Sequence, residues 1–288
     1  NQVFTTQIHK KNNVVSYFVY FSSTEETFSK NKFYSSCFDY AFMNYDYFVS
    51  DNLSINWMKG QQTKINNFLS VPTFSSELIK DAKKNKYLLK KKINLDNSNK
   101  VLSFFDHSLG MRGVMTQSTY KKFLLSIKDI SKDKNLNIFF KSKKNLNIFF
   151  EILNDENQLI LNNIIKNSNF YIANELNISH YELIAISDLI ISVPCSSIIS
   201  ESICSKINTI IYDPESMYYS SHLFLYNFPE IYANDNKSLN QKIYYFLNTN
   251  NKKYVDNLND RIMKKVYNTS YKENSYNMLV EYLKKNTV

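Results

Sequence analysis

From residue 100 onward, the sequence alternates short apolar runs with stretches of helical periodicity. Each run is five or six residues long and is bounded by polar residues, which is typical of a buried strand. The runs lie at 100–105, 136–140, 169–173, 188–193 and 208–212. Strands separated by helices of this length favour a mostly parallel sheet with right-handed crossovers. The sequence therefore predicts an α/β fold, and such folds bind ligands beyond the carboxyl ends of their strands.

Capping residues mark two helix starts in this region. Thr116 precedes a helical pattern of apolar residues, and its hydroxyl suits the cap position. Ser179 and Glu182 have the spacing of a capping box. The heptapeptide KNLNIFF occurs twice, at 134–140 and 144–150. We expect a strand from the first copy and a helix from the second, because no turn separates the second copy from the helix-length region after it.

The first hundred residues predict a smaller α/β unit. Apolar runs predict three strands, at 14–21, 46–50 and 68–71. A helix is expected near 52–60, and the polar, lysine-rich stretch 73–99 predicts a linker. Helical patterns at 238–248 and 271–285 close the chain. A complete first domain needs more chain than this, so we expect the N-terminal domain to be incomplete or reduced.

The turn after the run at 188–193 carries the strongest signal for a ligand site. Pro194, Ser196 and Ser197 lie at the start of the next helix, and Glu201 follows one helical turn later. Such a helix start presents unpaired N–H groups and the positive end of the helix dipole, which suits a phosphate. The carboxylate one turn further along is well placed to accept hydrogen bonds from a ribose. The alternative is that both serines only cap the helix and that Glu201 lies on its exposed face.

Two further loops follow strands and are expected at the same edge of the sheet. The loop at 105–113 contains His107, Gly110 and Arg112. Glycine lets a backbone approach a ligand closely, and arginine can pair with a diphosphate through two hydrogen bonds. In the second loop, Lys141 can pair with a phosphate. The alternatives are an ordinary turn in the first loop and a solvated lysine in the second.

The run ELIAISDLIISVPCSSIISESICSKINTIIYDP, at 182–214, resembles the nucleotide-binding region of GT-B-type glycosyltransferases that build bacterial surface polysaccharides. In that family a strand ends in a small-residue turn, and a helix bearing glutamate follows. The next strand then ends near Tyr-Asp-Pro, here at 212–214. The chain departs from the family at Ser142, because relatives commonly have proline between two basic residues there.

This resemblance implies a GT-B-like α/β architecture of two Rossmann-like, parallel-sheet domains. The first part, 1–95, is expected to be the partial acceptor-side domain with its linker. The second part, 96–270, is expected to bind the nucleotide-sugar. A final helix within 271–288 is expected to pack across the junction.

The resemblance also implies transfer of a sugar from a nucleotide-sugar donor to a surface-polysaccharide or lipid-linked acceptor, without a metal ion. It places the donor pyrophosphate at the serine turn and the ribose at Glu201. The expected donor site comprises Ser196, Ser197, Glu201, Arg112, Gly110, Lys141, His107 and Pro194. The acceptor hydroxyl needs a general base, which usually comes from the N-terminal domain. The candidates for this base are Asp39, Asp46 and Asp106.

Composition narrows the remaining possibilities. The formal net charge is +9, which fits either a lysine-coated soluble protein or attraction to an anionic nucleotide-sugar or membrane surface. No nucleic-acid-binding module accompanies the lysines. Cys37, Cys195 and Cys204 lack metal-site spacing and fit a reducing compartment. No apolar stretch approaches the ~20 residues that span a bilayer. We therefore expect a cytoplasmic enzyme without a cofactor, peripherally associated with the inner face of the cell membrane.

Three other classes stay open. A sugar-nucleotide 2-epimerase shares the double-domain architecture but needs several acidic and histidine residues, and this chain has only four histidines. A phosphotransferase acting on CDP-linked alcohols shares the serine helix start but is expected to carry a His-Pro pair, which the sequence lacks. A non-catalytic relative is the third class, because the N-terminal half is short and the lysine signature is partial.

Overall fold

The computed structural model describes most of the chain after residue 75 and parts of the chain before it. The described residues are 16–19, 28–29, 32–33, 45–50, 55, 65, 67–71, 73, 75–95, 98–107, 109, 115–194, 196–216, 228–248, 252–267 and 274–286. Gly110, Arg112, Cys195 and the candidate base Asp39 lie outside this set.

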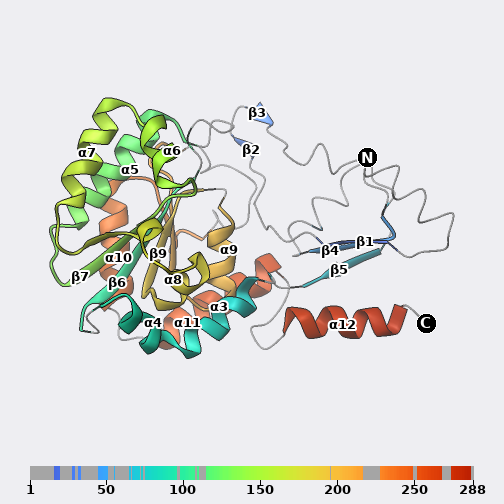
Figure 1. Cartoon of the computed structure of the whole chain (residues 1–288). Helices are drawn as coiled ribbons and strands as arrows, with labels where there is room; N and C mark the ends of the chain where they lie inside the picture. The colour runs from blue at the N-terminus through green and yellow to red at the C-terminus, as the bar shows by residue number, and fades with distance from the viewer. Residues whose placement is uncertain are drawn as a thin grey trace.

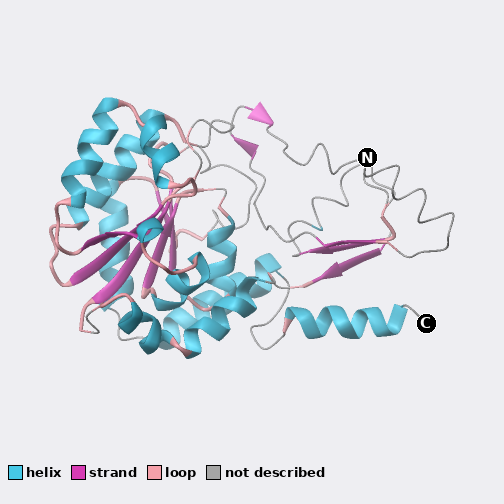
Figure 2. Ribbon diagram, in the orientation of Figure 1, coloured by secondary structure: helices cyan, strands magenta, loops and turns pink. Residues whose placement is uncertain are grey.

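The larger sheet has six parallel strands in the order β11-β10-β9-β6-β7-β8 (Figures 1 and 2). Its strands are β6 Lys100–Phe105, β7 Leu136–Lys141, β8 Phe170–Ile172, β9 Leu189–Ser192, β10 Thr209–Tyr212 and β11 Tyr232–Ala233. All five apolar runs predicted as strands are confirmed. The short β11 was not predicted, because two residues carry no readable periodicity.

Helices cover both faces of this sheet (Figure 1). They are α3 Ser75–Lys84, α4 Lys86–Lys92, α5 Gln117–Ile130, α6 Leu146–Ile152, α7 Asp155–Ile165, α8 His180–Ile186, α9 Ser197–Cys204, α10 Asn236–Asn248 and α11 Lys252–Ile262. A 3-10 turn, Ala173–Glu175, follows β8, and a π-helical turn, Met263–Tyr267, follows α11.

The alternation of side chains along β6 divides the core into two layers. Leu102 and Phe104 belong to the layer with α5, α7 and α10. Val101 and Phe105 belong to the layer with α3, α4 and α8. Because successive strand residues point to opposite faces, one strand that is apolar throughout supports both layers. This explains why the central strands have continuous apolar runs.

The local predictions of helix starts and of the repeat are confirmed. The Thr116 hydroxyl accepts a hydrogen bond from the Thr119 N–H at 3.1 Å. Ser179 and Glu182 form both bonds of the capping box. The two KNLNIFF copies contribute β7 and α6 respectively. The same sequence thus forms a strand in one copy and a helix in the other, so the neighbouring residues decide which structure forms.

The stretch 73–99 is not the linker that its lysines predicted. It forms α3 and α4, and α3 and α4 both pack against α8. Ile79, Leu89 and Leu95 are buried in the same layer as α8. These three apolar side chains form the buried face of an otherwise charged segment. The lysine content hid this helical periodicity.

The smaller sheet has the parallel strand order β1-β4-β5. Its strands are β1 Tyr17–Val19, β4 Tyr47–Ser50 and β5 Asn67–Ser70, which confirms the three strands predicted upstream. An antiparallel pair, β2 Phe28–Ser29 and β3 Lys32–Phe33, lies between β1 and β4 in the chain. The helix expected near 52–60 lies outside the described residues except for Ile55, which is helical.

The last helix, α12 Ser275–Asn286, lies beside the smaller sheet (Figure 1). The Tyr282 ring makes an edge contact with the Tyr47 ring of β4, at 5.7 Å between centroids. At the other end, the Asn274 amide donates to Glu77 of α3 at 2.9 Å. The helix therefore contacts both the smaller sheet and the helical cover of the larger one. No helix in the described part of the chain is long and apolar enough to cross a membrane.

Candidate functional site

The strand order of the larger sheet reverses between β6 and β9. The chain runs from β6 outward to β8 and then returns to β9 and runs outward in the opposite direction. In open α/β sheets, the crevice at such a reversal, beyond the carboxyl ends of the strands, is where ligands bind. Phe105 and Ser192 pair at these carboxyl ends. Two of the three predicted loops, those after β6 and β9, therefore flank this crevice.

The start of α9 carries the two serines that the sequence predicts to bind a phosphate. Ser196 occupies the cap position, but its side chain does not cap the helix. Ser197 is the first helical residue, and both serines are partly exposed. Pro194 is buried and lies in the turn after β9. The alternative that both serines act only as caps is therefore wrong for Ser196.

Glu201 is buried, with only 5 % of its surface exposed. The alternative that it lies on the exposed face of α9 is therefore wrong. Burial raises the pKa of Glu201, and the nearby hydroxyls of Ser75 and Ser197 oppose this shift. Its Oε2 atom is buried without a hydrogen bond and lies 4.0 Å from His180 Nε2. A buried carboxylate oxygen in this state has unused capacity for a hydroxyl donor.

His180, which is not among the expected site residues, lies next to Glu201. It is the first residue of α8, and its ring lies 3.8 Å from the Tyr181 ring. Burial lowers the pKa of His180, and the positive charge of Lys141 lowers it further. Both effects favour the neutral form of the imidazole beside Glu201. The sequence could not show this pair, because its members lie in separate βα units.

Lys141 ends β7 at the same edge of the sheet. Burial lowers its pKa, and the Asp106 carboxylate opposes that shift. The next residue, Ser142, stands where the related sequences commonly have proline. Here Asn174 fixes the backbone instead: its Oδ1 accepts from the Ser142 N–H at 3.0 Å, and its Nδ2 donates to the Ser142 carbonyl at 3.1 Å. The missing proline is therefore replaced by a polar clamp, which the sequence did not reveal.

The candidate base Asp106 forms hydrogen bonds that hold the fold together. Its Oδ2 accepts from the Tyr120 hydroxyl and its Oδ1 from the Lys143 N–H, each at 2.6 Å. Burial raises the pKa of Asp106 to about 6, against the opposing effect of these hydrogen bonds. This carboxylate joins the ends of β6 and β7 and so positions Lys141. Its neighbour His107 is also buried in the loop after β6.

The candidate base Asp46 lies at the wrong edge for catalysis. It precedes β4, and its Oδ2 accepts from the Ser16 N–H at 2.8 Å and from the Ser16 hydroxyl at 2.7 Å. These bonds join the amino ends of β1 and β4, whereas ligands of parallel sheets bind at the carboxyl ends. No residue in the described part of the chain is therefore assigned as the general base. The described residues also contain no group of three or more histidine, cysteine or acidic residues positioned to hold a metal ion.

The sequence profile of the polysaccharide biosynthesis PFTS motif proteins matches residues 1–241. The chain belongs to this family. No curated protein matches the chain.

Solved structures with the same fold come from two kinds of protein. The wall teichoic acid polymerase TagF superposes with a TM-score of 0.55 at 13 % identity, over 84 % of this chain and 59 % of TagF. The UDP-GlcNAc 2-epimerase from Neisseria meningitidis, bound to UDP-GlcNAc, gives a TM-score of 0.55 at 12 % identity, over 84 % of this chain and 62 % of the epimerase. S. aureus MnaA with UDP gives 0.55 at 10 % identity, over 98 % and 71 %. The family member described here thus has a GT-B-like fold and spans about three-fifths of the first two proteins.

In this family member, the larger sheet brings several predicted residues to one edge. Those within the described residues are Ser196, Ser197, Glu201, Lys141, His107 and Pro194. Gly110 and Arg112 follow β6 in sequence but lie outside the described residues. The Tyr-Asp-Pro end of β10 forms hydrogen bonds within the fold. The Asp213 carboxylate accepts from the Tyr232 hydroxyl at 2.6 Å, and the Tyr212 hydroxyl bonds to the Ser126 hydroxyl at 2.8 Å.

Proposed function

We propose that this protein is a glycosyltransferase that moves a sugar from a nucleotide-sugar to a surface-polysaccharide or lipid-linked acceptor. The observation that carries the proposal is the start of α9, where a serine that does not cap the helix lies one turn before a buried carboxylate. This start lies beside the strand-order reversal of a GT-B-like sheet. Membership of a polysaccharide biosynthesis family supports the same class of reaction.

The donor diphosphate binds at the α9 start in this proposal. The N–H groups of Ser197 and its neighbours and the Ser196 hydroxyl donate to phosphate oxygens, and the helix dipole favours the negative charge. Lys141 supplies a positive charge from the end of β7, and Arg112 supplies a second one. As the bond to the sugar breaks, negative charge grows on the leaving diphosphate. Fixed donors at this point stabilise the transition state more than the bound substrate.

The nucleoside binds beside α8 and α9. Glu201 Oε2 accepts a hydrogen bond from a ribose hydroxyl, which replaces the water it would otherwise need. His180, held neutral, packs next to this carboxylate and can donate or accept one further hydrogen bond. The protein charges described above stabilise the leaving group, so the proposed transfer is metal-independent and uses no cofactor.

The reaction requires a base for the acceptor hydroxyl, and the proposal leaves that residue unassigned. We place the reaction in the cytoplasm at the inner face of the membrane, where capsule, lipopolysaccharide or related polymers are assembled on lipid-linked acceptors. This placement follows from the proposed substrates and the net charge of +9.

A second candidate is phosphotransfer from a CDP-linked alcohol. The likeness to TagF, which was also solved after soaking with CDPG, supports it at a TM-score of 0.52 and 13 % identity. Two histidines, His107 and His180, also lie at the carboxyl edge of the sheet. The absence of a His-Pro pair counts against this candidate.

Nucleotide binding separates the two functions. The purified chain is tested by thermal shift and calorimetry with UDP, UDP-sugars, CMP-sugars and CDP-glycerol. Glycosyl transfer predicts stabilisation by UDP or a CMP-sugar, and phosphotransfer predicts stabilisation by CDP-glycerol. Loss of a hydrogen bond to a charged group corresponds to about 1.5–3 kcal/mol, so Glu201→Gln is expected to weaken binding about 10- to 150-fold. Ser197→Ala is expected to weaken it by a smaller factor.

Matched controls are Glu156→Gln and Ser168→Ala, which change the same residue types at exposed positions away from the crevice. Binding by these controls should equal that of the unaltered protein. If no nucleotide in the panel stabilises the chain, or if Glu201→Gln binds as tightly as Glu156→Gln, the proposed donor site is refuted.

A further inference from the structure

A basic, partly apolar surface lies on the α3 and α4 helices, away from the crevice. We call it the α3–α4 surface and define it by six exposed residues: Lys83, Lys84, Tyr87, Leu88, Lys91 and Lys92. Figure 1 shows both helices along one outer border of the molecule. The proposed transfer reaction uses none of these residues.

The exposed face of α4 combines two apolar and two cationic side chains. Tyr87 is 65 % exposed and Leu88 is 61 % exposed. Residues four apart share a helix face, so Tyr87 lies above Lys91, and Leu88 lies above Lys92. The opposite side of α4 is anchored, because Leu89 is buried against the α8 layer. A rigid helix therefore presents two neighbouring apolar groups to solvent, and nothing in the described fold covers them.

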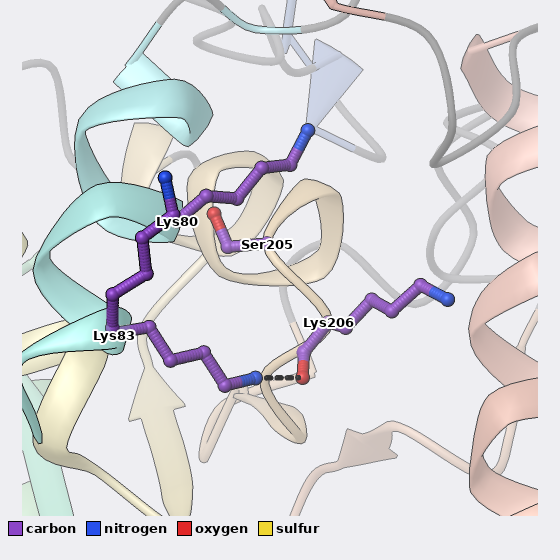
Figure 3. Close-up of a pocket in the computed structure, with 5 residues that line it drawn as sticks. Lys80, Lys83, Ser205 and Lys206 are labelled. Carbon is purple, nitrogen blue, oxygen red and sulfur yellow. Dashed lines mark hydrogen bonds between the residues drawn. The ribbon is translucent and has the colours of Figure 1, made fainter.

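A hollow of about 410 Å³ lies between α3 and the residues that follow α9 (Figure 3). It is lined by Lys80, Lys83, Lys84, Ser205 and Lys206, with no acidic residue in the lining. One wall is fixed by the Lys83 ammonium, which donates to the Lys206 carbonyl at 3.4 Å. The hollow is wide enough for a phosphate group and its ester oxygens.

The charge of the surface is positive after its internal pairs are counted. Seven lysines with exposed or partly exposed side chains lie on the two helices and in the hollow, namely Lys80, Lys83, Lys84, Lys86, Lys91, Lys92 and Lys206. Lys90 is buried and is not counted. Four carboxylates pair with the seven, namely Glu77, Asp81, Glu182 and Asp188, which leaves a net charge of +3.

We propose that the α3–α4 surface binds an anionic lipid bilayer. The lysines provide attraction to acidic headgroups, and a lipid phosphate enters the hollow. Tyr87 and Leu88 enter the boundary between headgroups and acyl chains, as exposed aromatic and aliphatic groups on peripheral proteins do. Such a surface keeps the enzyme at the membrane, and its membrane binding does not depend on the donor site.

Vesicle sedimentation of the full chain tests the proposal. The vesicles contain phosphatidylcholine alone or phosphatidylcholine with about a third phosphatidylglycerol. Each lysine near an anionic surface contributes about fivefold to binding, so Lys83→Gln/Lys91→Gln is expected to lower partitioning to the anionic vesicles about 25-fold. Tyr87→Ser/Leu88→Ser is also expected to lower partitioning to the anionic vesicles. This loss should be largest at high salt, where the attraction between lysines and headgroups is screened and the apolar contacts matter more.

Two matched variants control for exposure and charge. Leu159→Ser/Tyr244→Ser removes two similarly exposed apolar groups, and Lys128→Gln/Lys166→Gln removes two exposed lysines, all outside α3 and α4. Both should partition within twofold of the unaltered chain. All four variants change exposed side chains, so thermal unfolding and nucleotide binding should stay unchanged. This keeps the test distinct from that of the donor site.

The proposal is overturned if the unaltered chain does not sediment with anionic vesicles, or if it binds neutral vesicles equally well. It is also overturned if the control variants lose as much binding as the α3–α4 variants. Strong competition by an RNA oligomer, together with no vesicle binding, would assign the surface to another polyanion.

Discussion

At the scale of single residues, Asp106 shows how a buried acid can hold a site together without taking part in its chemistry. Both of its oxygens accept short hydrogen bonds, from Tyr120 and from the backbone of Lys143. The carboxylate is therefore committed to joining two strand ends. Lys141, one of the proposed phosphate contacts, ends one of these strands. The position of the proposed phosphate contact Lys141 thus depends on the buried carboxylate of Asp106.

Asp106 is expected to make stability depend on pH between about 4 and 6. Burial raises its folded-state pKa from 3.8 to about 6, so the folded protein holds the proton more tightly than the unfolded chain. Stability attributable to this group is full below about pH 4 and falls as pH rises through 6, by on the order of 3 kcal/mol. Asp106→Asn should flatten this part of the profile, measured as melting temperature against pH.

Tyr120→Phe provides the complementary test. The Tyr120 hydroxyl lowers the pKa of Asp106 against burial, so its removal should raise that pKa further and extend the decline above pH 6. Identical pH profiles for all three proteins would show that another group controls stability in this range.

At the scale of elements, the sequence predicted those whose signals are local. The five buried strands were readable because both of their faces are apolar, and Thr116 and Ser179 marked helix starts through contacts only three residues long. The two helices α3 and α4 were missed, since the three buried apolar residues that hold them are outnumbered by lysines. The structure of the two KNLNIFF copies could be predicted only from the residues around them, because the same sequence forms a strand in one place and a helix in the other.

Because only local patterns can be read from the sequence, only part of the site was predicted. The serine turn and Glu201 lie within one βα unit, so their spacing was visible. The partners of Glu201 come from elsewhere: His180 begins α8, and Ser75 begins α3. The clamp that Asn174 forms on the Ser142 backbone spans 32 residues. Contacts between units depend on the sheet topology, and no local pattern encodes them.

The capping box of α8 is expected to support both stability and nucleotide binding. This helix has only seven residues and carries His180 at its start. Ser179→Ala removes the cap, which typically corresponds to about 1 kcal/mol, and lets the first turn fray. The expected results are a melting temperature lower by about 2–4 °C and weaker nucleotide binding.

Asn154→Ala is the matched control, because the Asn154 side chain caps α7 through the Asn157 N–H at 2.9 Å. It should lower the melting temperature by a similar amount and leave nucleotide affinity unchanged. Equal losses of affinity in the two variants would mean that α8 has no specific part in the site.

At the scale of the whole molecule, α12 is the element that connects the two sheets. Its cap residue bonds to Glu77 of α3, and its far end reaches the smaller sheet through Tyr282. The Tyr47 ring, which Tyr282 contacts, also stacks on the Tyr17 ring at 4.7 Å. This aromatic group joins two adjacent strands and the last helix. The proposed glycosyl transfer would need such a connection, since that proposal expects donor and acceptor on opposite parts of the chain.

Removing the Tyr282 ring should therefore loosen the smaller sheet and leave the larger one intact. An aromatic pair contributes about 0.5–1.5 kcal/mol beyond the area it buries, so Tyr282→Ala should increase amide exchange in β4 severalfold or more. Exchange in β6 should stay at the rate of the unaltered protein, because the core around β6 does not include Tyr282. Tyr244→Ala, at a position 73 % exposed, should change the exchange rate of neither strand.

Faster exchange in β6 as well as in β4 of Tyr282→Ala would mean that the chain unfolds as a single unit and that α12 is part of one common core. Unchanged exchange in β4 would mean that the Tyr282 contact does not stabilise the smaller sheet, and the connection would then rest on the bond between Asn274 and Glu77.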